Sequence, residues 1–408
     1  MPIGAHAVRA VTAAGTCAII SIAPAWSQSQ PWELLYNQEI RYISWQGTRG
    51  WPPGLALLPG SGSQLYTPLT IQLTGLPAPD LKFEFIGRGG YVNARQSTTG
   101  ATGSVSTFTD TVTAATLTYL GIPGIQPFVS FNANLPSGTS ALLGTATFAR
   151  MDPDLVDLAT FGEGWNFGPT IGFNLPVTPM LIFSLGAGHT VRGAYQRENT
   201  LVPGTVNRLD PGDVATITAS LGYRGGPLTA QISSMFVHEE VSSLDGTPFF
   251  QFGNRYLVSG TANFAWTATS TSTLTASWSY TEKNKLIAPP AILVPTLEAF
   301  NSNSNVYRVR FEHAFAFGSW TAGPIVSWML RDKNAYVPVA FQFVPAKTRW
   351  SVGGSLRYSV SGNVLLYGSV EHIWVDEGLR PFAIPPAGPI PALSYTAWLA
   401  VFGGTVRF

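Results

Sequence analysis

Charged side chains recur at every second residue in segments that are otherwise apolar. In the segment 308–311, Arg308 and Arg310 alternate with Val309 and Phe311. Successive side chains of a β-strand point to opposite faces, so the charges of such a segment share one face. Along the whole chain the bases on this polar face outnumber the acids: the bases are Arg41, Lys82, Arg88, Arg192, Arg224, Arg255, Arg308, Arg310, Arg331, Lys347, Arg349, Arg357 and Arg407, and the acids are Glu39, Glu84, Glu239, Glu312 and Glu371.

A face of this kind can act on dissolved ions and solutes through its charge. If it lines a water-filled passage, an excess of bases raises the local concentration of anions. The same groups could instead pair with one another and only brace the wall. The sequence leaves both interpretations open.

Catalytic and metal chemistry have little support in the sequence. No histidine has a histidine partner two or four residues away, so we expect no metal site. His238 and Glu239 are adjacent in an extended segment, where neighbouring side chains point to opposite faces, so they form no catalytic dyad. We expect no enzyme activity and no cofactor. The net charge of +1 gives no reason to expect a nucleic-acid partner.

Turns divide the chain into segments long enough to cross a membrane as strands. Only 11% of the residues are charged, against about a quarter in soluble domains, and no apolar stretch of about 20 residues follows the N-terminal region. A closed barrel is the other way to span a bilayer. The sequence therefore predicts an all-β fold, a transmembrane antiparallel β-barrel of about sixteen strands, with short turns in the periplasm and long loops outside. A soluble β-sandwich would show similar alternation. The short turns are expected at 75–80, 121–124, 176–179, 224–227, 269–271, 317–319 and 361–363, and the long connections at 48–63, 95–104, 135–163, 193–211, 240–253, 283–302, 334–346 and 377–393.

The two ends of the chain support secretion and membrane insertion. Residues 1–25 have the pattern of a signal peptide, with Arg9 before an apolar stretch and Ala23-Pro24-Ala25 as the cleavage site. The barrel is then expected over 26–408. The single cysteine, Cys17, lies in the signal, so the mature chain is expected to have no disulfide. The last strand ends on Phe408, on a face that it shares with Trp398 and Phe402.

The sixteen-strand pattern resembles the general diffusion porins of Gram-negative bacteria. In that family the loop after the fifth strand folds into the barrel and narrows the pore, with acids facing arginines. The loop 135–163 has this position here, and the resemblance implies that its acids Asp152, Asp154, Asp157 and Glu163 form the constriction. It also implies that Phe408 is read by the barrel-assembly machinery. The segments 131–138 and 161–170 look like barrel proteins encoded with aromatic-degradation pathways, which are thought to import hydrophobic compounds.

The sequence thus predicts an outer-membrane channel for passive diffusion of small hydrophilic solutes, with a mild preference for anions. One alternative is a transporter of hydrophobic or aromatic compounds, favoured by the apolar, Pro-rich segments 51–60, 286–300 and 381–393. Another is an export or surface-docking barrel. The expected partners are outer-membrane lipid, small solutes and the assembly machinery, and a homotrimer stays open. The predicted pore-lining residues are Arg41, Lys82, Glu84, Arg88, Arg255, Arg308, Arg310, Glu312, Arg331, Lys347, Arg349 and Arg357.

Overall fold

A computed structural model describes most of the chain. The described residues are 32–47, 60–98, 101–199, 204–286, 296–340, 342–383, 389–390 and 392–408. The predicted signal peptide, 1–25, lies outside them, as does most of the apolar segment 51–60. No helix in these ranges is long and apolar enough to cross a membrane.

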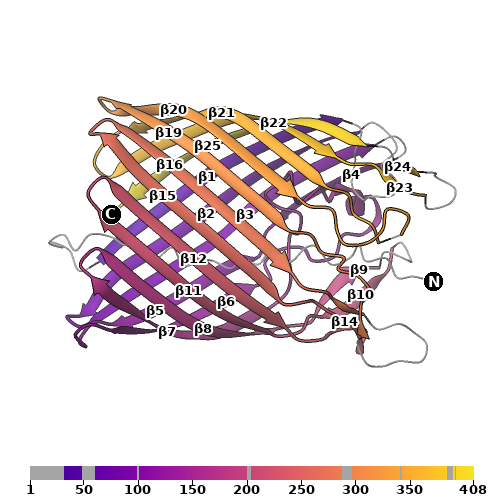
Figure 1. Cartoon of the computed structure of the whole chain (residues 1–408), viewed down its shortest axis with the longest axis horizontal. Helices are drawn as coiled ribbons and strands as arrows, with labels where there is room; N and C mark the ends of the chain where they lie inside the picture. The colour runs from indigo at the N-terminus through magenta and orange to yellow at the C-terminus, as the bar shows by residue number, and fades with distance from the viewer. Residues whose placement is uncertain are drawn as a thin grey trace.

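Sixteen antiparallel strands form a closed barrel (Figure 1). Each strand pairs with the next one along the barrel, and β1 pairs with β25 from Leu35 opposite Arg407 to Gly47 opposite Tyr395, which closes the sheet. The predicted fold and strand number are confirmed. The barrel strands are β1 (Trp32–Gly47), β2 (Gly60–Ala78), β3 (Leu81–Thr98), β5 (Thr111–Tyr119), β6 (Gln126–Leu135), β7 (Asn166–Thr178), β8 (Leu181–Arg192), β11 (Val214–Gly225), β12 (Leu228–Glu239), β15 (Arg255–Thr267), β16 (Ser270–Thr281), β19 (Val306–Phe317), β20 (Trp320–Arg331), β21 (Lys347–Ser359), β22 (Val364–Glu377) and β25 (Leu393–Arg407).

Short turns join the strands at one end of the barrel, which we call the turn end. Gly226 and Gly318 have φ angles of 54° and 61° there. Residues with side chains rarely adopt such angles, whereas glycine does so at little cost, and tight hairpin turns require them. The chain can therefore reverse between β11 and β12, and between β19 and β20, within two residues. All seven predicted short turns fall between paired strands.

The long connections lie at the opposite end, the loop end, and contain strands that the sequence did not predict. Six short strands contributed by three connections form a second sheet, the cap sheet: β9 (Tyr195–Glu198), β10 (Val206–Asp210), β13 (Ser242–Leu244), β14 (Thr247–Gln251), β17 (Lys285–Leu286) and β18 (Thr296–Leu297). Two more, β23 (Arg380–Ala383) and β24 (Pro389–Ile390), pair with each other.

The predicted connection 95–104 is placed wrongly. Strand β3 continues to Thr98, and β4 (Ala101–Phe108) pairs back along it from Thr98 opposite Ala101 to Tyr91 opposite Phe108. The true connection between β3 and β5 is thus a β-hairpin that extends beyond the barrel wall. The Ser- and Thr-rich segment 101–108 alternates as a strand does, and its polar composition made it resemble a loop.

Two single-cysteine variants test which end of the barrel faces outward. Thr247 lies in the cap sheet and Thr178 beside a short turn, and both are exposed. With the loop end outside, a membrane-impermeant maleimide should label Thr247→Cys on intact cells, and should label Thr178→Cys only after permeabilisation. The opposite pattern would show that the barrel is inverted.

Candidate functional site

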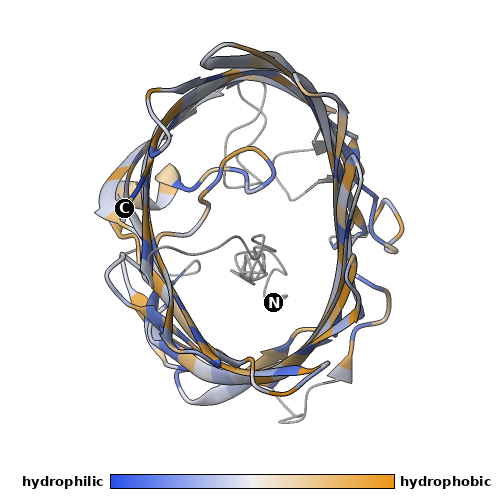
Figure 2. Ribbon diagram, turned by 90° about the vertical axis from the view of Figure 1, so that its left-hand side faces the viewer, coloured by the Kyte–Doolittle hydropathy of each residue, from blue (hydrophilic) through white to orange (hydrophobic). Residues whose placement is uncertain are grey.

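The loop 135–163 enters the interior of the barrel (Figure 2). Asp110, which lies between β4 and β5, holds both of its ends. One carboxylate oxygen of Asp110 accepts a hydrogen bond from the backbone N–H of Gly138 at 2.9 Å. The other oxygen accepts bonds from the backbone N–H of Glu163 at 2.7 Å and from the side chain of Asn134 at 2.8 Å. A single carboxylate therefore fixes where the loop leaves the wall and where it returns.

The first half of the loop packs on β4. It contains a 3-10 helix, η2 (Gly144–Ala149). A Cβ atom at Gly103 of β4 would lie 2.5 Å from the carbonyl oxygen of Thr145 and 2.6 Å from the backbone nitrogen of Ala149. Only a glycine permits this close approach, so the β3–β4 hairpin and the helix form one unit.

Apolar side chains hold the rest of the loop against the inner wall. Leu142, Met151, Leu155, Val156 and Phe161 are each at most 6% exposed. Burial of one such side chain stabilises the docked position of the loop by about 1.5–3 kcal/mol relative to an exposed one, so the five together contribute on the order of 10 kcal/mol to this docking. Their partners on the wall are Ile43 and Trp45 of β1, Tyr66 of β2, Val92 and Ala94 of β3, Ile373 and Val375 of β22, and Tyr395 and Ala397 of β25. The sequence predicted charged side chains on this inner face and gave no indication of the apolar cluster.

Acids at the tip of the loop meet bases of the barrel wall. Asp152 lies 2.6 Å from the Lys347 ammonium group, and Asp154 lies 2.6 Å from the Arg331 guanidinium group. Lys347 also lies 3.1 Å from Asp154 and 3.2 Å from Glu377. All five side chains are at most 9% exposed. We call these residues, Asp152, Asp154, Arg331, Lys347 and Glu377, the ionic cluster.

The ionic cluster lies across the barrel from the point where the loop begins. The loop follows β6, the fifth barrel strand, whereas Arg331 and Lys347 belong to β20 and β21, the thirteenth and fourteenth. In a barrel of sixteen strands these positions are opposite each other. The loop therefore covers the inner face of β3, β2, β1, β25 and β22, and it leaves the inner face from β8 to β19 uncovered.

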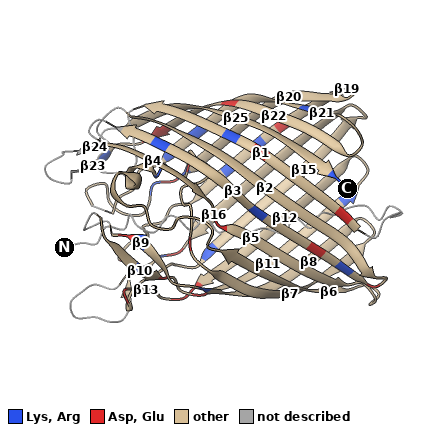
Figure 3. Ribbon diagram, turned by 180° about the vertical axis from the view of Figure 1, so that it is seen from behind, with Lys and Arg blue, Asp and Glu red and all other residues tan. Residues whose placement is uncertain are grey.

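Four arginines extend below the ionic cluster toward the turn end, and they keep contact with water although they point inward. Their side chains are 51%, 41%, 46% and 30% exposed for Arg308, Arg310, Arg357 and Arg41 respectively. Figure 3 shows charged residues distributed along the barrel from the loop end to the turn end. We call these four residues the arginine row.

Carboxylates lie behind the arginine row, closer to the wall. Arg310 binds Glu371 at 2.9 Å, and Arg357 binds Glu312 at 2.7 Å. The acids are only 3% and 16% exposed, less than the guanidinium groups that cover them. Arg41 likewise covers Glu39 at 2.6 Å and reaches Asp157 of the loop at 3.1 Å. A solute in the interior therefore meets guanidinium groups first, but each base carries an acid beside it.

The uncovered wall carries neutral hydroxyl groups. Ser233 of β12 and Ser259 of β15 share a hydrogen bond at 2.8 Å, and Thr273 of β16 donates to Asn263 at 2.7 Å. Their neighbours on the strands point the other way, as Leu274 shows with 45% exposure on the outer face. Between the charged groups of β8, β12 and β15 at the loop end and those of β19, the middle of this wall carries hydroxyl groups.

The outer face of the barrel is a continuous apolar belt. Almost every barrel strand contributes a large apolar side chain that is more than a third exposed and alternates with the inward residues: Ile40, Ile71, Leu117, Val129, Ile171, Ile217, Ile232, Leu274, Val309, Val326, Val352, Val370 and Phe402. Tryptophans flank the belt, and the Trp328 ring lies 6.2 Å from the Trp350 ring. A closed barrel with such a belt and aromatic girdle is built for lipid. The chain forms a β-barrel of the kind that spans a membrane.

No protein-family model and no curated protein sequence matches this chain. Solved structures with a similar course of the chain include an outer-membrane channel from Pseudomonas putida F1, with 13% identity over 64% of this chain and 92% of that chain and a TM-score of 0.41. OmpF of Salmonella typhi has 11% identity over 92% of this chain and 97% of its own, with a TM-score of 0.38. A mutant of the monoaromatic hydrocarbon channel TodX has 9% identity over 95% and 92%, with a TM-score of 0.42.

The predicted site residues of the barrel fall into separate groups. Arg308, Arg331, Lys347 and Arg349 lie around the loop tip, where Arg349 donates to the backbone carbonyl of Asp154 at 3.2 Å. The other residues lie elsewhere on the wall or loop. On β3, Lys82 pairs with Glu84 at 2.9 Å near the turn end, and Arg88 lies exposed in the middle of the strand. Arg255 pairs with Glu239 at 3.2 Å near the loop end, and Glu163 lies at the root of the loop beside Asp110.

Phe408 completes the seam of the barrel. Its backbone N–H donates to Leu34 at 2.9 Å, and its side chain is 66% exposed on the outside. Its reading by an assembly machinery stays a prediction.

The sequence reasoning missed three acids that shape this site. Asp110 anchors the loop, Glu198 of the cap sheet binds Arg150 of the loop at 2.7 Å, and Glu377 completes the ionic cluster. Glu377 lies six residues after Glu371, so the period of two places both on the inner face. It was missed because the strand was expected to end there. With these acids and those of the loop, the charges inside the barrel come close to balance.

Proposed function

We propose that the barrel is a passive channel for small hydrophilic solutes. The observation that carries this proposal is the contrast in exposure on the inner face. Side chains under the loop are nearly inaccessible, whereas the inward-pointing Arg308, Arg310 and Arg357 keep 41–51% of their surface in water. Solutes would pass between the arginine row and the hydroxyl wall, and the loop 135–163 would narrow this passage from one side.

A mild preference for anions is consistent with the arrangement of charges. Guanidinium groups face the passage and carboxylates lie behind them, which favours anions at short range. Because each base has an acid within about 4 Å, the field falls off quickly and the preference should be modest. The arrangement favours hydrophilic over hydrophobic solutes, since apolar side chains of the loop already cover the apolar part of the inner wall.

A pair of tryptophan substitutions tests whether solutes use this passage. Thr275 and Leu274 are neighbours on β16, and Thr275 points to the interior opposite Arg310 of β19, whereas Leu274 points to lipid. In liposomes that contain the barrel, Thr275→Trp should slow osmotic swelling in a small sugar by severalfold, because the indole occupies the passage. Leu274→Trp should swell at the wild-type rate. The proposal fails if the wild-type barrel admits no sugar, or if both variants behave alike.

A further inference from the structure

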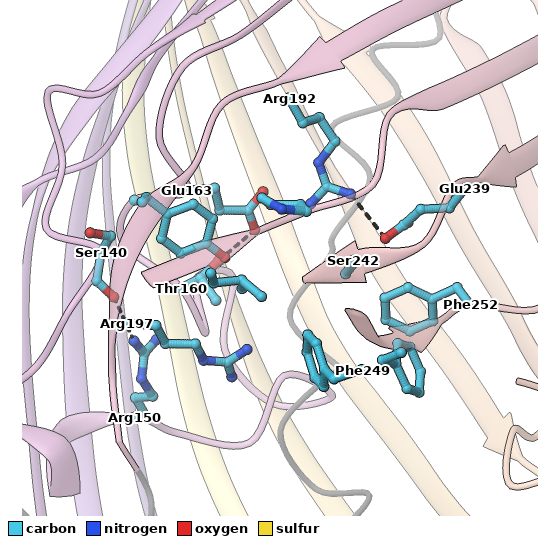
Figure 4. Close-up of a pocket in the computed structure, with 15 residues that line it drawn as sticks. Ser140, Arg150, Thr160, Glu163, Arg192, Arg197, Glu239, Ser242, Phe249 and Phe252 are labelled. Carbon is cyan, nitrogen blue, oxygen red and sulfur yellow. Dashed lines mark hydrogen bonds and ion pairs between the residues drawn. The ribbon is translucent and has the colours of Figure 1, made fainter. Parts of the chain in front are cut away.

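A pocket lies at the loop end, apart from the arginine row. The root of the loop 135–163, the ends of β8 and β12 and the cap sheet strands β9, β10, β13 and β14 enclose it (Figure 4). The volume of the pocket is about 40 Å³. It is therefore a small site that excludes large solutes.

One side of the pocket is aromatic. Phe250 and Phe252 pack edge to face with ring centroids 4.7 Å apart, and Phe249 lies 6.1 Å from Phe250. Phe250 is only 5% exposed, so the neighbouring rings stand on a rigid base. Aromatic rings of a ligand gain about 0.5–1.5 kcal/mol from such contacts beyond the area that they bury.

Among the charged side chains of the pocket, one guanidinium group lies outside the ion pairs that the structure describes. Glu239 lies 3.0 Å from Arg192 and 3.2 Å from Arg255, and Glu198 holds Arg150 at 2.7 Å. The guanidinium group of Arg197 has no hydrogen bond or ion pair with any residue that the structure describes, and Figure 4 shows it extending toward Phe249. A planar guanidinium group matches the geometry of a carboxylate, which it can bind through two parallel hydrogen bonds.

We infer that this pocket binds a single-ring aromatic carboxylate, with its ring against Phe249 and Phe252 and its carboxylate on Arg197. The aromatic side supplies the contact for the ring, and Arg197 supplies a positive charge for the carboxylate. A neutral or cationic ring compound has no carboxylate to bind this charge. Binding at equilibrium does not require conduction, so this inference stands or falls separately from the channel function.

Glu163 gives the pocket a dependence on pH. Burial raises the pKa of Glu163 to about 7, because the loss of water outweighs the attraction of Arg192 and a weak hydrogen bond from Thr160 at 3.5 Å. Below this pH the group is neutral, and above it a negative charge stands beside the ligand. A carboxylate ligand should therefore bind more tightly as the pH falls from about 8 to about 6. The other charged and titratable groups that face Glu163 are Arg192, Arg255, Asp110, Glu239 and Tyr195.

Calorimetric titration of the purified, detergent-solubilised barrel with benzoate tests the inference. Benzoate should bind, and benzylamine, of the same size but opposite charge, should not. Arg197→Gln should weaken benzoate binding by about tenfold or more, and Arg197→Lys should restore part of it. Arg208→Gln is the matched control, because Arg208 is an exposed base on the next strand of the cap sheet and does not line the pocket. Heat-modifiable migration of each variant checks that the barrel is folded.

Three results would overturn the inference. They are no benzoate binding at pH about 6, equal binding by Arg197→Gln and Arg208→Gln, or benzylamine binding as tightly as benzoate. Glu163→Gln provides an independent readout, because it should remove the pH dependence between about 6 and about 8 while leaving binding in place. An unchanged pH dependence in Glu163→Gln would count against the role of Glu163.

Discussion

Replacement of Asp152 and Asp154 together by Asn should increase the single-channel conductance of the barrel. The change leaves Arg331 and Lys347 buried with Glu377 as their only remaining acid in the cluster. Breaking a buried ion pair on one side costs about 3–5 kcal/mol. Two such losses match or exceed the burial of Met151, Leu155 and Val156 at about 1.5–3 kcal/mol each. The tip of the loop should therefore leave the wall so that the two bases can be hydrated.

The other anchors of the loop limit this change. Asp110 still holds the root, and η2 still packs on β4, so the barrel should stay folded and only the tip should move. The freed bases should also shift the ion preference toward anions. Planar-bilayer recordings measure both effects at once.

Asp157→Asn provides the control for the ionic cluster. Asp157 also pairs with a wall base, but it is 41% exposed and its partner Arg41 is 30% exposed. Pairs that water reaches contribute about 0–1 kcal/mol. Conductance should therefore stay close to that of the wild type. If the double variant and Asp157→Asn conduct alike, the apolar cluster alone holds the loop and the ionic cluster has no latching role.

The barrel itself could be predicted because its signals are local. A period of two residues and a tight turn at each hairpin are visible within about 25 residues of sequence. The cap sheet could not be predicted, since its strands are two to five residues long and the three strand pairs that build it come from three different connections. Phe250 of β14, for example, pairs with Leu286 of β17. A strand of two residues has no detectable period, and only the folded barrel brings such segments together.

The inward face of the strands could also be predicted, but not the partners across it. Arg308, Arg310 and Arg357 point inward as their positions required, because charged groups on the lipid face would cost several kcal/mol. The period of two equally places Trp45 on the same face as Arg41. The assumption of a polar interior hid the apolar cluster, which exists only because a loop from the opposite wall covers it. Lys347 and Asp152 are 195 residues apart, and no local pattern relates them.

Loss of Arg308 and Arg357 should shift the reversal potential of the channel toward cations. These two are the most exposed members of the arginine row, and their acids keep other partners when they are removed. Asp154 retains Arg331 and Lys347, and Glu312 retains a hydrogen bond from Ser355 at 3.1 Å. The double change to Gln therefore removes positive charge from the passage without leaving a buried acid unpaired.

Arg310 and Arg349 are unsuitable for the same test. Glu371 is only 3% exposed beside Arg310, and without Arg310 it would have no base within ion-pair distance among the described residues, so the wall itself would be perturbed. Arg349 binds the backbone of the loop at Asp154, so its loss would move the loop as well as the charge.

The size of the shift follows from the pairing of the charges. A perfectly selective channel gives about 59 mV for a tenfold gradient of a monovalent salt. Because acids remain near each base, Arg308→Gln with Arg357→Gln should move the reversal potential by only a part of this. The effect should fade at about 1 M salt, where the Debye length is about 3 Å. Arg208→Gln, which removes one positive charge from the cap sheet outside the passage, should leave the potential unchanged. An identical reversal potential for the double variant and the wild type at low salt would mean that permeating ions do not pass the arginine row, and the path of solutes would have to lie elsewhere.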